Sequence, residues 1–178
     1  VADLAEILGY KIVFFDDEYP EKKQLEHWDI NGNFNDLLLT KEIYEGVVVA
    51  IGNNNTRHRL SNKVIEGGFK LPVLIHPSSI ISKYAQIGAG TVVFANVVIN
   101  AFAQVGTSCI INTGAIVEHD CILGNGVHLS PNVSLAGATI IGEHSWLGIA
   151  SVTNQRITIG KCVTVGANST VISDISSN

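Results

Sequence analysis

A histidine between two acidic residues is the feature of this sequence best suited to catalysis. His119 follows Glu118 and precedes Asp120. A neighbouring carboxylate can fix the tautomer of an imidazole and raise its basicity, so His119 could act as a general base. The same residues could instead form a solvated polar turn without a catalytic role, and their spacing alone leaves both interpretations open.

Two further histidines are weaker candidates. His128 could hydrogen-bond the carbonyl of a thioester, or it could pack between neighbouring protomers. His144 follows an acidic residue in a polar turn, and we assign it no role. The steps from His119 to His128 and from His128 to His144 are nine and sixteen residues. This spacing contains no close pair of metal ligands, so we predict no metal site.

The three cysteines, Cys109, Cys121 and Cys162, form no CxxC pair and no zinc-ligand spacing with histidine. An odd number of scattered cysteines is typical of a reducing compartment, so we expect a cytoplasmic protein. Cys109 and Cys121 fall at small inward-facing positions of the repeat described below. This favours buried structural side chains over reactive thiols.

Composition narrows the classes of partner. The chain has 178 residues, of which 46% are hydrophobic and 15% charged, so it can bury a substantial core. A net charge of -5 offers no basic surface for phosphates, and we expect no nucleic-acid partner. No apolar run approaches the length of a membrane span and no export signal is visible, so we expect no membrane insertion.

A strict six-residue repeat occupies the second part of the chain. Sixteen positions at this spacing, from Ile81 to Val171, are aliphatic with the single exception of Thr153. Four residues after them the side chains are mostly small or β-branched. A period of six excludes an α-helix and predicts a triangular, left-handed parallel β-helix of about five coils, in which three hexapeptides form one coil.

The repeat also predicts where individual side chains lie. The aliphatic residue points into the prism, so His119, two residues after Val117, points outward. Side chains eighteen positions apart lie above one another, which places His119 beneath Gly137 and His128 beneath Trp146. Glycine recurs one residue after the aliphatic position, and we expect it to take the strained turn conformation. These glycines are Gly88, Gly106, Gly124, Gly142, Gly148, Gly160 and Gly166.

The first 75 residues lack the repeat and alternate strand and helix patterns. Apolar runs at 11–15, 46–51 and 71–75 predict three buried strands, and 56–67 predicts a helix. This alternation is typical of a parallel α/β sheet, in which ligands bind beyond the carboxyl ends of the strands. The polar or flexible residues at those ends are Asp16, Asp17, Gly52 and Asn53.

The chain begins without Met, on a segment (1–9) that has the pattern of an amphipathic helix closed by Gly9. We therefore expect a small α/β, Rossmann-like domain at 1–75 that is truncated at its N-terminus. A β-helix domain is expected at 76–178.

Two motifs together carry a resemblance to a known family. The turn Ala50-Ile51-Gly52-Asn53-Asn54 precedes a hexapeptide solenoid that contains Val117-Glu118-His119-Asp120-Cys121. This combination resembles the sialic acid O-acetyltransferase (NeuD)-type hexapeptide-repeat family. It is closest in pattern to the PglD-like UDP-4-amino-sugar N-acetyltransferases of bacillosamine biosynthesis.

The resemblance implies acetyl transfer from acetyl-CoA to the 4-amino group of a UDP-4-amino-4,6-dideoxy-N-acetyl-hexosamine, by a homotrimer without a metal. His119 would be the general base, oriented by Asp120, where relatives carry glutamate. The contact could therefore fall to Glu118. The residues implied to contact the cofactor are His128, Gly137 (through its amide, as an oxyanion donor), Ile149 and Gly166. Those implied around the uridine and its phosphates are Asp16, Asp17, Gly52, Asn53 and Arg57.

Two departures and three alternatives accompany this resemblance. The chain lacks the family's glycine-rich turn after a first strand and its C-terminal Gly-x-Pro-Ala segment, so we expect weakened binding of the nucleotide sugar. One alternative is O-acetylation of sialic acid or another sugar hydroxyl. A second is a γ-type carbonic anhydrase-like metal enzyme, and a third is an inactive scaffold.

Overall fold

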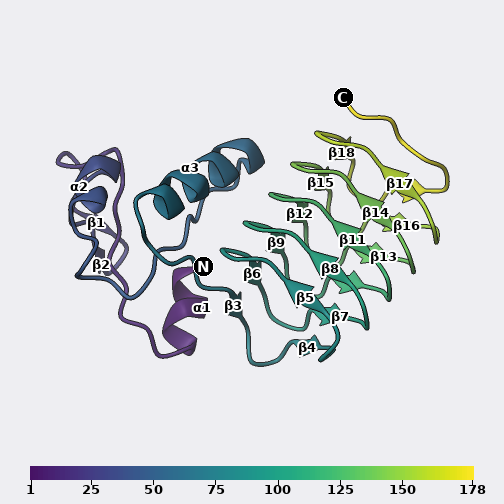
Figure 1. The fold of residues 1–178 in the computed structure, drawn as a ribbon, viewed down its shortest axis with the longest axis horizontal. Coiled ribbons are helices and arrows are strands. Elements are labelled where there is room, and N and C mark those ends of the chain that lie inside the picture. Colours follow the sequence, from purple (N-terminus) through teal and green to yellow (C-terminus); the bar gives the residue numbers. More distant parts are fainter.

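The structure is a computed structural model that describes residues 1–178. Its larger part is a left-handed parallel β-helix that confirms the predicted solenoid, and its smaller part is an N-terminal region of short helices (Figure 1). Helices α1 (Ala2–Ile7) and α3 (Asn54–Glu66) lie between the solenoid and the elements formed by residues 24–38 in Figure 1. None of the helices has both the length and the apolar character needed to cross a membrane.

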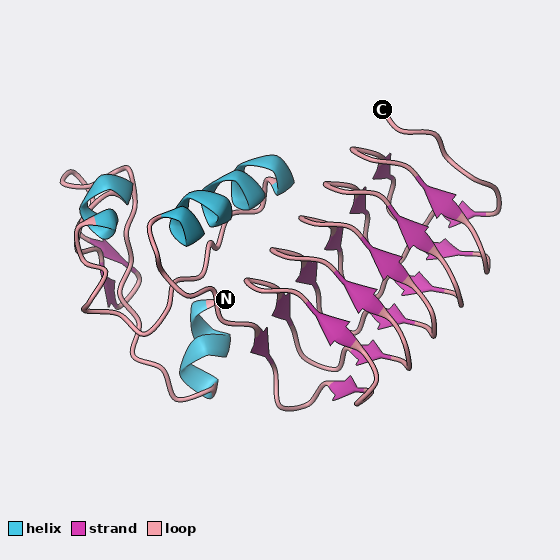
Figure 2. Ribbon diagram, in the orientation of Figure 1, coloured by secondary structure: helices cyan, strands magenta, loops and turns pink.

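Three parallel sheets form the sides of the solenoid. They contain six, five and six strands, each strand only two residues long (Figure 2). Every strand pairs with the strands eighteen residues away, as Val117 does with Ile99 and Leu135. One side consists of β4 (Ile80–Ile81), β7 (Val98–Ile99), β10 (Ile116–Val117), β13 (Ser134–Leu135), β16 (Val152–Thr153) and β19 (Thr170–Val171).

The other two sides repeat the same arrangement. The second consists of β5 (Gln86–Ile87), β8 (Gln104–Val105), β11 (Ile122–Leu123), β14 (Ile140–Ile141) and β17 (Thr158–Ile159). The third consists of β3 (Leu74–Ile75), β6 (Val92–Val93), β9 (Ile110–Ile111), β12 (His128–Leu129), β15 (Trp146–Leu147) and β18 (Thr164–Val165).

The core of the solenoid is one cluster of 22 buried residues built from the aliphatic and small positions of the repeat. Cys109 and Cys121 are fully buried in it, whereas Cys162 is exposed, and all three are free thiols. The inward Thr153 interrupts the apolar column, and its hydroxyl lies 3.0 Å from that of the buried Thr139. Pairing of the two hydroxyls removes the cost of burying either one alone.

The recurring glycines have a different role from the one we predicted. Positive φ values occur every six residues from Gly90 to Asn168, one position in each turn, and that position includes Phe102 and Asp120. The glycines that follow the aliphatic position have no positive φ. A Cβ on Gly106 would instead lie 2.7 Å from the backbone of Gly124 in the next coil. All of these glycines except Gly166 are therefore required by the close approach of neighbouring backbone, which cannot move aside as a flexible side chain can.

The N-terminal region contains α1 (Ala2–Ile7), the antiparallel hairpin β1 (Gln24–Leu25) and β2 (Trp28–Asp29), α2 (Phe34–Leu38) and α3 (Asn54–Glu66). Leu4 and Ala5 of α1 pack against Leu74 and Val92 of the solenoid. The helix predicted at the start of the chain is confirmed and is followed by Gly9 at φ +87°. Helix α3 begins two residues before the predicted start because the Asn53 side chain caps it.

The predicted three-stranded parallel sheet was wrong in detail. Residues 46–51 form no strand. Their backbone makes one hydrogen bond to the segment before β3, from Val47 N to Lys70 O. Residues 11–15 contain only an isolated bridge between Phe14 and Ile30. Within 71–75, β3 forms, but it pairs with β6 of the solenoid. Apolar runs indicate burial and extension, whereas a strand also needs a partner ladder.

Candidate active site

His119 lies at one corner of the solenoid, in the turn that follows β10. The preceding Val117 is fully buried and anchors the turn, so the His119 side chain, 62% exposed, projects into solvent. Asp120 occupies the positive-φ position of the same turn, at +60°, and its amide donates to Ala101 O in the coil below at 3.1 Å. The geometry of the repeat therefore fixes the backbone positions of His119 and Asp120.

The imidazole of His119 contacts Asp120. Nδ1 of His119 lies 2.8 Å from Oδ2 of Asp120, and since a carboxylate only accepts, Nδ1 is the donor. The proton on Nδ1 leaves Nε2 with its lone pair free. Glu118 contacts only the backbone amide of His119, at 3.4 Å. The shorter aspartate thus reaches the ring, and the contact does not pass to Glu118.

Gly137 lies directly above this histidine. A Cβ on Gly137 would stand 2.6 Å from Nε2 and 2.7 Å from Cε1 of His119, which confirms the predicted stacking of the two residues. The Gly137 carbonyl accepts from Arg156 N, while its amide makes no hydrogen bond within the chain. A cavity of about 330 Å³ opens here, lined by His119, Asp120, Gly137, Ala138, Gln155 and Arg156.

His128 is in a drier environment on β12. Its ring stacks with that of Trp146, with centroids 6.1 Å apart, as the predicted register requires. Burial, with a smaller contribution from the charge of Arg57, lowers the pKa of His128 to about 4. The ring is therefore neutral at pH 7, and its Nε2 is buried without a hydrogen-bond partner. A buried polar atom of this kind needs a partner that the single chain does not supply.

The other two predicted cofactor residues lie on coils farther toward the C-terminus. Ile149 follows β15 and is 54% exposed. Gly166 follows β18, and a Cβ there would stand 3.4 Å from Ser169 Oγ. Both residues therefore lie at a different corner of the prism from His119 and Gly137, which follow β10 and β13 of another sheet.

Arg57, predicted to contact the nucleotide, is 2% exposed and bonded within the chain. All five N–H groups of its guanidinium donate to protein oxygens, at 2.8–3.0 Å. Two of these acceptors, Ser108 O and Gly126 O, belong to successive coils of the solenoid. Burial lowers the pKa of Arg57 to about 10, so the residue stays charged and joins α3 to the solenoid.

The remaining predicted substrate residues also make local bonds. Asp16 Oδ1 accepts from Glu18 N at 3.0 Å, and Asp17 Oδ1 accepts from Phe34 N at 3.3 Å, at the start of α2. Asn53 caps α3 through Thr56 N, and Gly52 O accepts from Arg57. The structure records no hydrogen bond between the two aspartates and the Gly52–Asn53 turn, or from either pair to His119.

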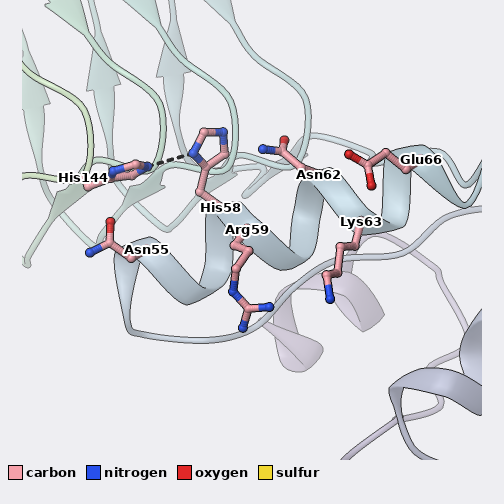
Figure 3. A pocket seen from close by; sticks show the side chains of 7 residues that line it. All are labelled: Asn55, His58, Arg59, Asn62, Lys63, Glu66 and His144. Atoms are coloured by element: carbon pink, nitrogen blue, oxygen red, sulfur yellow. Dashed lines mark hydrogen bonds between the residues drawn. The ribbon is translucent and has the colours of Figure 1, made fainter.

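A second, wholly polar cavity lies between α3 and the solenoid, and the sequence interpretation missed it (Figure 3). Its volume is about 380 Å³, and His58 Nδ1 lies 2.8 Å from His144 Nε2 at its edge. Burial, then the neighbouring His144, lowers the pKa of His58. The helical spacing of one polar face could have revealed it: the lining residues on α3 are Asn55, His58, Arg59, Asn62, Lys63 and Glu66.

The histidines of the solenoid do not converge within one chain. His119 contacts Asp120, His128 stacks on Trp146, and His144 contacts His58. No group of three or more His, Cys, Asp or Glu side chains is arranged to hold a metal ion.

Comparisons with known proteins match both parts of the chain. Residues 1–64 match the family described as the PglD N-terminal domain. The acetyltransferase domain of PglB from Neisseria gonorrhoeae FA1090 is 39% identical, with a TM-score of 0.90 over 98% of this chain and 85% of that one. A further structure of that domain contains acetyl coenzyme A. PerB from Caulobacter crescentus, in complex with CoA and GDP-perosamine, is 34% identical, with a TM-score of 0.93 over 99% and 84%.

Two curated relatives are named for different nucleotide sugars. GDP-perosamine N-acetyltransferase of Escherichia coli O157:H7 is 26% identical over 83% of this chain and 66% of its own length. UDP-N-acetylbacillosamine N-acetyltransferase of Bacillus subtilis (strain 168) is 46% identical over 27% of this chain and 22% of its own length. The chain thus spans just under two thirds of the first relative and about a fifth of the second.

Proposed function

Because the chain belongs to the PglD-type family of sugar N-acetyltransferases with a left-handed β-helix, we propose that it moves the acetyl group of acetyl-CoA to the amino group of a nucleotide-linked amino sugar. The observation that carries this proposal is the His119–Asp120 pair. Its free Nε2 lies against Gly137, and His119 and Gly137 both line the cavity described above. A base oriented by a carboxylate at an open cavity is the arrangement that direct transfer to an amine needs.

In the proposed mechanism the sugar amine attacks the thioester carbonyl, and His119 Nε2 takes the proton that the nitrogen loses. Asp120 stabilises the imidazolium that forms. The negative charge on the carbonyl oxygen is met by the unbonded Gly137 amide, as at an oxyanion hole. Collapse of the tetrahedral intermediate breaks the carbon–sulfur bond, and the proton on His119 goes to the leaving thiolate.

His128 lies on a different side of the prism from the His119 corner, so it is proposed to hold the acetyl carbonyl in the ground state across an interface between two protomers. Its low pKa keeps the ring neutral, and its buried Nε2 has no partner in the chain. Ile149 and Gly166, at another corner of the prism, are proposed to border the pantetheine arm across the same interface. Large apolar side chains stay exposed on the outer faces, among them Ile122, Ile140, Trp146 and Ile149. This supports a homotrimer in which neighbouring prisms cover these faces and form the cofactor grooves.

The acceptor is proposed to be a UDP-4-amino-4,6-dideoxy-N-acetyl-hexosamine bound by the N-terminal region, 1–75, while transfer takes place on 76–178. Asp16, Asp17, Gly52 and Asn53 are its proposed contacts. The similarity to UDP-N-acetylbacillosamine N-acetyltransferase supports the UDP-linked sugar, and the similarity to perosamine N-acetyltransferases supports a GDP-linked one as the alternative. The three free thiols favour a cytoplasmic location for the reaction.

A substrate competition tests the proposal. The protein is supplied with acetyl-CoA and, separately, with a UDP-4-amino-4,6-dideoxy-N-acetyl-hexosamine, GDP-perosamine and a sialic acid, and thiol release is measured. Transfer to the UDP-linked amine is the expected result. Transfer only to GDP-perosamine would support N-acetylation but show that the substrate is linked to GDP and not to UDP. Transfer only to the sialic acid hydroxyl would overturn N-acetylation.

A further inference from the structure

Thr153, the polar exception in the inward column, also interrupts the hydrogen-bond ladder of its sheet. On this side of the prism, the amide that follows an inward residue donates to the carbonyl of the inward residue in the next coil. Such bonds run from Asn100 N to Val117 O, from Glu118 N to Leu135 O and from Asn154 N to Val171 O. The amide of Ala136 instead donates to the hydroxyl of Thr153, at 3.1 Å. Strands β13 and β16 accordingly pair through Ser134 and Val152 only.

Thr139 closes a ring of hydrogen bonds around Ala136. Its hydroxyl donates to Ala136 O at 2.7 Å and lies 3.0 Å from the hydroxyl of Thr153, while Asn154 O is farther away, at 3.3 Å. Because the single proton of the Thr139 hydroxyl is used on the shortest contact, the Thr153 hydroxyl is the donor between the two side chains. Two buried hydroxyls thus hold both the N–H and the C=O of Ala136.

The carbonyl of Ala136 belongs to the same peptide group as the amide of Gly137. In a trans peptide the C=O and the N–H point in opposite directions, so a carbonyl held by the buried Thr139 turns the Gly137 amide outward. The thiol of Cys121, one coil below, donates to the same carbonyl at 3.3 Å. Two donors on the carbonyl polarise the peptide group, which makes its N–H a stronger donor.

The rest of this turn is held in a different way. Gly137 O accepts from Arg156 N at 3.0 Å, and Ala138 N donates to His119 O at 2.9 Å, so both groups are fixed by backbone of neighbouring coils. Only the peptide between Ala136 and Gly137 depends on side chains for its orientation. The hydroxyls of Thr139 and Thr153 therefore control the direction of the amide that lies at the His119 corner without a partner in the chain.

We propose that Thr153 and Thr139 are positioning residues for the acetyl transfer, an inference that rests on the proposed function. Neither hydroxyl bonds to His119, and both act through Gly137, whose amide is the proposed donor to the oxyanion. Charge on the carbonyl oxygen develops only during the reaction, so the direction of this donor affects the transition state more than substrate binding. Loss of the pair therefore lowers kcat and leaves KM nearly unchanged.

Two substitutions of Thr153 separate positioning from stability. Thr153→Val completes the aliphatic column and lets the Ala136 amide bond the carbonyl of residue 153, so the melting temperature should not fall. Its kcat should drop about tenfold, while KM for acetyl-CoA and for the amino sugar should change less than about twofold. Thr153→Ser keeps the hydroxyl, so kcat should stay within about twofold of the wild type, although the cavity left by the methyl group lowers the melting temperature.

Thr91→Val is the matched control for Thr139→Val. Thr91 occupies the same position of the repeat, is fully buried and bonds backbone at another corner, through Gly106 O and Cys109 N. Both variants should lower the melting temperature, but only Thr139→Val should lower kcat. A wild-type kcat in Thr153→Val, or equal losses of kcat in Thr153→Val and Thr153→Ser, would overturn the positioning role.

NMR of protein with isotope-labelled glycine separates this result from that of the proposed function. The Gly137 amide signal is identified by its absence in Gly137→Ala. Thr153→Val should shift this signal and leave that of Gly88 in place, and Thr153→Ser should shift it less. If the wild type acetylates none of the sugars supplied, the proposed function fails, while a selective shift still supports control of the Gly137 amide by the two hydroxyls. An unshifted Gly137 signal would overturn the inference whatever the activity.

Discussion

Two corners of the same solenoid carry histidines but differ in what covers them. At the first, His119 and Asp120 are exposed beneath Gly137 and border an open cavity. At the second, α3 packs over the turns that contain Ser108, Gly126 and His144. Two backbone carbonyls and His144 at the second corner bond to α3, which fixes the N-terminal region in place, and the polar cavity beside them is lined mainly by α3 itself. The first corner has no such cover, so the His119 and Asp120 side chains stay exposed.

The comparison shows how a regular scaffold acquires a reactive site. Every turn repeats nearly the same backbone, and positive φ recurs at the same position in each. Reactivity therefore depends on which side chains occupy a corner and on what packs against it. A histidine alone does not define the site, because His144 has a ring nitrogen contact as short as that of His119, 2.8 Å in both cases.

The largest effect is expected from removal of His119. The His119→Ala variant should lower turnover by about two to four orders of magnitude while largely keeping affinity for acetyl-CoA, because a general base is lost and the binding groove is not. Steady-state kinetics and CoA titration measure the two quantities. His144→Ala should leave turnover within a few-fold of the wild type. Equal losses in both variants would remove the distinction between the corners.

At the corner covered by α3, the largest expected effect is a loss of stability in the Arg57→Met variant. The substitution leaves the buried carbonyls that Arg57 now contacts without donors, which should lower the free energy of unfolding by about 2–4 kcal/mol. Urea denaturation measures the change. Arg59→Met, on an exposed residue of the same helix, is the matched control and should be nearly neutral. Unchanged stability with a raised KM for the nucleotide sugar would instead support phosphate binding by Arg57.

Two glycines should respond differently to alanine. In Gly137→Ala the new methyl group would displace the His119 ring, so turnover should fall by about one to two orders of magnitude with little change in stability. In Gly106→Ala the methyl group meets backbone of the next coil, so the free energy of unfolding should fall by about 1–3 kcal/mol. Parallel kinetics and thermal melts would separate them, and a Gly137→Ala enzyme of normal activity would contradict the stacked geometry.

Acidification should lower the stability of the fold through two half-buried histidines. The folded-state pKa values of His128 and His58 are lowered, to about 4 for His128, so below pH 6.5 the unfolded chain binds protons that the folded chain does not. Stability should be complete above pH 6.5 and fall as the pH drops toward 4, by about 1–2 kcal/mol after allowance for partial exposure. Urea unfolding at several pH values measures this decline. The decline should be smaller in His58→Gln, and an unchanged decline would mean that His58 does not contribute.

The solenoid could be predicted from the sequence and most of the N-terminal region could not. The six-residue repeat directly gave the inward column, the register of Val117 with Ile99 and Leu135, and the stacking of His119 under Gly137. Periodicity is informative there because each coil contacts only its neighbours. The apolar run at 46–51 indicated a strand, but no partner forms a ladder with it. Whether a partner strand is present depends on segments far apart in the chain, and an apolar run does not reveal it.

The sequence by itself determined the fold of the solenoid, the outward direction of His119 and the buried positions of Cys109 and Cys121, because these follow from a local period. Only the tertiary structure decided that Asp120 and not Glu118 contacts His119, and that Arg57 spends all its donors on holding α3 to the solenoid. It also decided that the recurring glycines, except Gly166, serve the close approach of neighbouring backbone. These outcomes depend on distances between segments far apart in the chain, which residue spacing alone does not specify.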